Sequence, residues 1–248
     1  MYNNKLKTKE IKEKFKDKES FSYTDLLNFY LETEPDLKIG TYKWRVYKLK
    51  EIGFLDTVRK GEYILGTRVE FAPIIKLTLK KQYNLITKKY PYIEVVVWET
   101  GWLNEFMIHQ PFISLTIIEV DREAITAVFN TLKETNVHVY LDPTIEDIEN
   151  YIISQNSIVV KPLLRESPSK LIGKINTPKI EKILVDIFTD SNLFITYQGY
   201  ELERIYESIF TLYSVNMTTL ERYAKNRGGK EDIKKFIGRI DSISKKYK

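Results

Sequence analysis

The chain has 248 residues, of which 43% are hydrophobic and 29% charged, and its net charge of +5 is too mild to decide a partner. It has no cysteine and two histidines, which excludes disulfides, thiolate metal sites and a cysteine nucleophile. No apolar run reaches the roughly 18 residues that a membrane-spanning helix needs. Because the first twenty residues also lack the apolar stretch of a signal peptide, we expect a cytoplasmic protein. We also expect no metal or other cofactor.

The first seventy residues predict three helices followed by a hairpin. Ile11 and Phe15 lie four residues apart, on one face of a short helix over residues 7–15. Ser22 and Asp25 have the spacing of a capping box, which opens a second helix.

The third predicted helix has a basic face. Thr41 is a suitable N-cap and Gly53 a suitable C-terminal stop. The apolar residues at helical spacing should face the core, and these are Tyr42, Val46, Leu49 and Ile52. The remaining surface carries Lys43, Arg45, Tyr47, Lys48 and Lys50, and no acid occurs between residues 43 and 50.

A strand over residues 54–58, a turn at 59–62 and a strand over 63–65 predict a hairpin with a basic tip. With the three helices, this describes a winged helix-turn-helix domain over residues 1–68, whose third helix would enter the major groove of double-stranded DNA. The predicted DNA contacts are Thr41, Lys43, Trp44, Arg45, Tyr47, Lys48, Lys50, Arg59 and Lys60. A winged helix used for protein contacts alone is the alternative.

The middle of the chain alternates between strand and helix patterns and predicts a small α/β sheet domain over residues 74–165. The expected strands cover residues 93–98, 113–118, 137–140 and 157–161. The expected helices cover residues 77–89, 102–107, 122–134 and 144–153.

Residues 166–248 predict a helical C-terminal part packed on the sheet domain. Pro178 is placed at the first position of a helix, where its missing N–H does no harm. Further helices are expected over residues 199–213, 217–225 and 230–246. The whole chain is therefore expected to be of the mixed α+β class.

The search for catalytic residues favours a protein that is not an enzyme. Several acids lie at predicted strand ends, where carboxylates can hold Mg²⁺ for nuclease chemistry: Glu94, Glu99, Glu105, Glu119 and Asp121. No Asp/Glu-x-Lys follows on the second strand, and Asp121 is well placed to cap the next helix, so a nuclease is the weaker alternative. Ser167 and Lys170 match a Ser-x-x-Lys spacing by chance, and His109 and His138 are expected to be structural.

Three stretches resemble blocks of one family: Trp98–Asn104, Thr177–Asp186 and Leu220–Gly228. They are similar to the AbiEi-type antitoxins, the transcriptional regulators of type IV toxin–antitoxin and phage abortive-infection systems. The N-terminal winged helix is also similar to theirs, so the resemblance spans nearly the full length in order.

The resemblance implies a protein with two roles. The winged helix would bind inverted repeats upstream of its own operon and repress it, through Lys43, Trp44, Tyr47, Lys48, Arg59 and Lys60. The C-terminal part would neutralise a nucleotidyltransferase-type toxin through a surface that includes Asp186, Arg222, Lys225 and Arg227. This chain departs from the family pattern in its aromatic content and its elaborated sheet domain. The alternative is a regulator whose α/β domain binds another protein, or a small ligand near Trp98, Trp102 and Tyr140.

Overall fold

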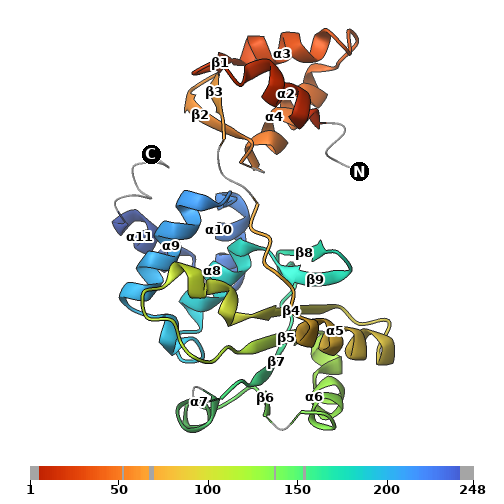
Figure 1. Cartoon of the computed structure of the whole chain (residues 1–248), viewed down its shortest axis with the longest axis vertical. Helices are drawn as coiled ribbons and strands as arrows, with labels where there is room; N and C mark the ends of the chain where they lie inside the picture. The colour runs from red at the N-terminus through yellow and green to blue at the C-terminus, as the bar shows by residue number, and fades with distance from the viewer. Residues whose placement is uncertain (1–5, 52, 67–69, 137, 153–154, 241–248) are drawn as a thin grey trace. The chain divides into compact units, whose positions relative to one another are not determined.

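The computed structural model describes residues 6–51, 53–66, 70–136, 138–152 and 155–240, without the side chains of Glu51 and Arg59 (Figure 1). The chain divides into two compact units. Unit 1 comprises residues 1–71 with 209–216, and unit 2 comprises residues 72–208 with 217–248. Helices and small sheets occur together, so the mixed α+β class expected from the sequence is confirmed.

Unit 1 combines helices with a small antiparallel sheet. The helices described there are α2 (Thr8–Phe15), α3 (Tyr23–Leu31) and α4 (Ile39–Glu51). The strands β1 (Phe21–Ser22), β2 (Leu55–Arg59) and β3 (Glu62–Leu65) pair in the order β1-β3-β2. The core is formed mainly by Ile11, Phe15, Leu26, Phe29, Tyr30, Tyr42, Val46, Leu49, Leu55 and Tyr63. The predicted apolar faces are therefore confirmed, except that Ile52 lies outside the described residues.

Local signals set most of the boundaries in unit 1. Ser22 Oγ accepts from the Asp25 backbone N–H at 3.0 Å, which confirms the capping box. Gly61 has φ +79°, the left-handed conformation that the tight turn between β2 and β3 requires. The prediction of Thr41 as N-cap is wrong, because α4 begins at Ile39 and already includes Thr41.

Unit 2 is built on a sheet whose described strands are ordered β4-β5-β7-β6. They are β4 (Val95–Glu99), β5 (Thr116–Val120), β7 (Ile158–Pro162) and β6 (Val139–Leu141). β4 runs antiparallel to β5, and the other neighbours are parallel. All four correspond to predicted strands, although β5 begins three residues later than expected.

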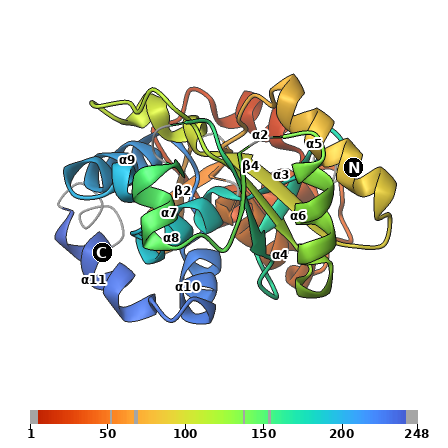
Figure 2. The same ribbon diagram turned by 90° about the horizontal axis from the view of Figure 1, so that it is seen from below.

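Helices cover both faces of this sheet. On one side lie α5 (Leu77–Lys89), which has the predicted bounds, and α6 (Ile125–Lys133). On the other side lies α8 (Ile180–Thr189), as both views show (Figures 1 and 2). The shorter elements are η1 (Thr100–Phe106), η2 (Arg122–Ala124) and α7 (Ile145–Asn150).

The C-terminal part departs from the prediction in its first element, and the predicted helix over residues 230–246 ends at Arg239, with residues 241–246 outside the described part of the chain. A hairpin of β8 (Ser169–Ile172) and β9 (Ile175–Pro178) precedes α8, so Pro178 ends a strand and does not begin a helix. The elements η4 (Ile195–Tyr197), α9 (Tyr200–Leu212), α10 (Met217–Asn226) and α11 (Lys230–Arg239) follow. None of the helices in the described part of the chain is long and apolar enough to cross a membrane.

Candidate functional site

The outer side of α4 combines positive charge with exposed aromatic rings. Lys43 and Lys50 are exposed, and Trp44 and Tyr47 have relative exposures of 38% and 53%. We call these four residues the α4 face. Lys48 is half-buried, with its Nζ 5.6 Å from the centre of the Tyr47 ring. No acid occurs from residue 39 to residue 50, so this stretch of α4 adds no negative charge to the surface.

Arg45 does not belong to this surface, and its prediction as an exposed DNA contact is wrong. Its side chain is buried, and its Nη1 and Nη2 donate to the two carboxylate oxygens of Glu34 at 3.0 and 2.8 Å. The guanidinium also lies 4.7 Å from the centre of the Tyr30 ring. The helical period explains this position, because Arg45 is three residues after Tyr42 and four before Leu49, within the buried stripe.

Glu34 also forms an ion pair with Lys7, which directly precedes α2. The Nζ of Lys7 lies 2.8 Å from Glu34 Oε1. Hydrogen bonds from Arg45, and then from Lys7, lower the pKa of Glu34 to about 2. Glu34 therefore stays ionised and connects α4 to the residues that precede α2.

The remaining predicted DNA contacts lie at two further places. Thr41 is exposed in the first part of α4. Lys60 is exposed at the turn between β2 and β3. The backbone of Arg59 belongs to β2, but its side chain lies outside the described residues.

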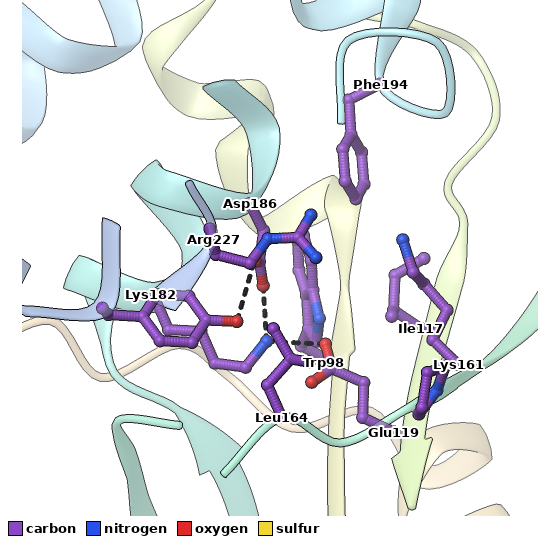
Figure 3. A pocket seen from close by; sticks show the side chains of 11 residues that line it. Trp98, Ile117, Glu119, Lys161, Leu164, Lys182, Asp186, Phe194 and Arg227 are labelled. Carbon is purple, nitrogen blue, oxygen red and sulfur yellow. Dashed lines mark hydrogen bonds and ion pairs between the residues drawn. The ribbon is translucent and has the colours of Figure 1, made fainter. Parts of the chain in front are cut away.

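A buried ion cluster lies on the α8 side of the sheet in unit 2 (Figure 3). Lys182 of α8 is 1% exposed, and its Nζ donates to Glu119 Oε1 of β5 at 2.7 Å. The same ammonium donates to Asp186 Oδ2, one helical turn further along α8. Although burial alone disfavours the ammonium, Asp186 and Glu119 hold the pKa of Lys182 above its ordinary value. Burial raises the pKa of Glu119, with Lys182 opposing it.

α10 completes the cluster. The Tyr223 hydroxyl donates to Asp186 Oδ1 at 2.9 Å, and Arg227 Nε lies 3.5 Å from that oxygen. Asp186 is 6% exposed, so its prediction as part of an antitoxin surface is wrong. Arg222 and Lys225 are exposed on α10, whereas Arg227 is half-buried.

The cluster has no room for a substrate. The cavity beside it has a volume of about 10 Å³, which is space for about one water molecule. Both carboxylates are already hydrogen-bonded to Lys182. We conclude that the cluster holds β5, α8 and α10 together.

The acids considered for a nuclease site do not gather at one place in the described structure, although Glu94 and Asp121 are neighbours. The described residues contain no group of three or more His, Cys, Asp and Glu side chains that could hold a metal ion. Asp121 does not cap η2, because its Oδ2 accepts from the Glu94 backbone N–H at 2.8 Å. Glu105 is exposed, and Glu99 lines a separate polar cavity together with His138.

His109 and Tyr140 also have polar partners. His109 Nδ1 lies 2.9 Å from Glu201 Oε1. Tyr140 accepts a hydrogen bond from Gln155 at 3.2 Å, whereas Trp98 lies beside the buried cluster.

The model of a family of unknown function, DUF6577, matches residues 41–242. The chain belongs to the DUF6577 family. The matched range begins in the first part of α4 and includes the β2–β3 hairpin and all the described elements of unit 2. No curated protein matches the sequence.

In this DUF6577 protein, the sequence blocks Trp98–Asn104, Thr177–Asp186 and Leu220–Gly228 meet at the buried cluster. The first block contributes Trp98 from β4, the second Lys182 and Asp186 from α8, and the third Tyr223 from α10. Lys182 was not predicted to have a role. The available signal was a lysine within the apolar run of α8, all of whose residues from Ile180 to Ile187 are buried.

Proposed function

We propose that this protein is a sequence-specific DNA-binding transcriptional regulator, in which residues 1–68 form a winged helix-turn-helix domain and α4 is the recognition helix. The observation that carries the proposal is the α4 face. It presents two lysines and two aromatic rings from a stretch of helix without acids.

The order of elements in unit 1 supports this proposal. Helices α2, α3 and α4 precede the β2–β3 hairpin, and the short strand β1 pairs with β3. In a winged helix the third helix enters the major groove, and the hairpin tip approaches the phosphate backbone. α4 has 13 residues, a length of about 20 Å, and Lys60 is exposed at the hairpin tip.

The buried ion pair of Arg45 supplies a rigid support for the α4 face. Glu34 lies in the segment between α3 and α4, and Arg45 projects inward from the middle of α4. A bidentate pair resists rotation of the helix about its axis, because both N–H groups would have to leave their oxygens. Arg45 is thus a positioning residue for the lysines on the opposite side of the helix.

The side chains of the α4 face can contact both the phosphate backbone and the base edges of DNA. Lysine can bind phosphate or the acceptor edge of guanine in the major groove, and aromatic carbon can contact the methyl group of thymine. Lys43 and Trp44 lie nearer the N-terminal end of α4, the end that contacts base edges in helix-turn-helix proteins.

The test is a titration of the full chain against labelled DNA from directly upstream of its own gene, with excess random competitor and at two salt concentrations. We expect binding that survives the competitor and weakens with salt, with a slope of about −0.9 for each neutralised phosphate. The double variant Lys43→Ala, Lys50→Ala should lose this binding. Its matched control is Lys80→Ala, Lys81→Ala, which removes the same charge from exposed positions of α5 in unit 2.

Single variants separate the two kinds of contact. Lys43→Ala should cost about 1–3 kcal/mol of binding free energy and change the sequence preference if Lys43 contacts a base, but should weaken all sequences alike if it contacts phosphate. Unchanged binding by the double variant, or an equal loss in the control, would overturn the proposal for α4.

Antitoxin activity is the second proposed function, and it rests on the three resembling blocks. Because these blocks meet in the interior of unit 2, the residues proposed to contact a toxin are the exposed Arg222 and Lys225 of α10, with Arg227 at their edge. The partner would be a nucleotidyltransferase-type toxin whose gene lies beside this one.

Co-expression with that toxin tests the second function separately from the first. Cells that carry both proteins should grow, and the variant Arg222→Ala, Lys225→Ala should restore growth arrest while leaving operator binding unchanged. The α4 double variant should show the reverse pattern. Growth arrest in the presence of the unaltered protein would contradict the antitoxin proposal without affecting the DNA-binding one.

A further inference from the structure

A second cavity of unit 2, with a volume of about 500 Å³, lies where β4 ends and β5 and β7 begin. Glu99, Thr116 and Ile158 are direct partners in neighbouring strands, so their side chains lie on one face of the sheet. Trp98 and Ile117 point to the opposite face, where they line the buried ion cluster. The cavity is therefore separate from that cluster and lies on the side of α5.

Two side chains that line the cavity have a buried acceptor oxygen without a hydrogen bond among the described residues. Glu99 has a relative exposure of 6%, and its Oε2 has no hydrogen-bond partner among the described residues. Gln82, on the first half of α5, has a buried Oε1 that likewise has no such partner in the described part of the chain. Buried acceptors are normally paired, so two of them on side chains that line one cavity point to a ligand that carries hydrogen-bond donors.

The charge at Glu99 is only weakly compensated by the protein. Lys76 Nζ lies 3.4 Å from Glu99 Oε2, beyond a strong charge-assisted hydrogen bond, and the Lys76 side chain is 60% exposed. A long, exposed lysine can leave this position and extend into water. A buried carboxylate needs a closer cation to balance its loss of hydration.

We infer that this cavity binds a small molecule with a guanidinium group, which pairs with Glu99 and donates also to Gln82. A guanidinium is planar, always charged and carries N–H donors in a fixed fork, so one group can serve two acceptors. The volume is within the range of small-molecule pockets, roughly 300–1,000 Å³. Apart from Ile158, the lining is polar and offers hydroxyl and amide groups to the rest of the ligand.

Calorimetric titration of the full chain with L-arginine tests the inference. L-citrulline is the control ligand, because it has the same length and carries an uncharged urea in place of the guanidinium. We expect one saturable site for L-arginine and at least about tenfold weaker binding of L-citrulline, since the urea lacks the charge that Glu99 requires. Hydrogen exchange should show protection on binding near Gln82, Thr116 and His138.

Variants locate the site. Glu99→Gln keeps the shape of the side chain and should weaken L-arginine at least about tenfold, whereas Glu94→Gln removes the same charge from an exposed position and should change nothing. Gln82→Met removes the second acceptor and provides an independent measurement if Glu99→Gln does not fold. It should weaken binding severalfold.

Three results would overturn the inference. They are the absence of saturable L-arginine binding, equal affinity for the two probes, and unchanged affinity in a folded Glu99→Gln or Gln82→Met variant. None of these results depends on DNA or toxin, so a failure here leaves the proposed function untouched.

Discussion

Each unit contains a buried cation that is paired with carboxylate, but the carboxylates differ in their exposure to water. Arg45 in unit 1 pairs with Glu34, whose side chain is 34% exposed. Lys182 in unit 2 pairs with Glu119 and Asp186, whose side chains are 7% and 9% exposed. Both cations project from a helix into the interior, but only the carboxylate of unit 1 keeps substantial contact with water.

From this difference we expect the access of water to the carboxylate to determine what each ion pair contributes to the free energy of unfolding. Hydration and two donors keep Glu34 ionised, so this pair can orient α4 without a large desolvation cost. In the cluster of unit 2, burial opposes the charge on both Glu119 and Lys182, and each of these ions favours the charge on the other. We therefore expect the two sites to respond very differently when one partner is removed.

The largest effect is expected for Lys182→Met. It removes the ammonium that both Glu119 and Asp186 contact in the interior, and breaking a buried pair in this way costs about 3–5 kcal/mol of unfolding free energy. Urea unfolding followed by circular dichroism measures the change. Lys174→Met, in the exposed turn between β8 and β9, is the control. A loss below about 1 kcal/mol would show that the cluster is not held by Lys182.

A smaller effect is expected for Arg45→Met, about 1–3 kcal/mol, because Glu34 can regain water after the guanidinium is lost. The contact with the Tyr30 ring contributes to the same loss. Hydrogen exchange should show the increase in opening mainly in α4. Arg45→Lys should recover only part of the stability, since an ammonium cannot form the bidentate pair. Full recovery in Arg45→Lys would contradict the geometric role of the fork.

Features that depend on neighbouring residues could be predicted from the sequence, but the burial of a charged residue was missed. The capping box at Ser22, the bounds of α5 and the β2–β3 hairpin depend on neighbouring residues, and all were predicted. Arg45 was assigned to the surface because it is charged, although its spacing from Tyr42 placed it in the buried stripe. In that case periodicity was the better guide than charge.

Features that depend on distant partners were not predictable. Lys182 and Glu119 are 63 residues apart in the sequence, and nothing near either residue indicates the other. Strand β1 has two residues, too few for an alternating pattern, and exists because it pairs with β3. The cavity at Glu99 likewise requires the register of three strands, which alternation within each strand does not specify.

The pH dependence should also differ between the two sites. Glu34 has a pKa of about 2 when folded, below the ordinary value of 4.5. It therefore contributes stability that is present in full above about pH 4.5 and is lost as the pH falls toward 2. Glu119 has a raised pKa, so its ionisation opposes stability as the pH rises.

Hydrogen exchange of α4 between pH 2 and 6 measures the loss of stability caused by protonation of Glu34. The variant Glu34→Gln should remove that part of the dependence of stability on pH. An unchanged slope in this variant would assign the acid sensitivity to other groups.

The smallest effect is expected where an ion pair is fully accessible to water. Lys14 Nζ lies 2.9 Å from Glu32 Oε1, as close as the contacts of Arg45, but the two side chains are 50% and 56% exposed. Lys14→Ala should therefore change the unfolding free energy by less than about 0.5 kcal/mol, because water replaces the lost partner on both sides. The measurement is the same urea titration used for Lys182→Met and Arg45→Met. A loss as large as that of Arg45→Met would mean that distance, and not burial, sets the strength of these pairs. The expected order, in which stability loss follows carboxylate burial at nearly constant distance, would establish the opposite.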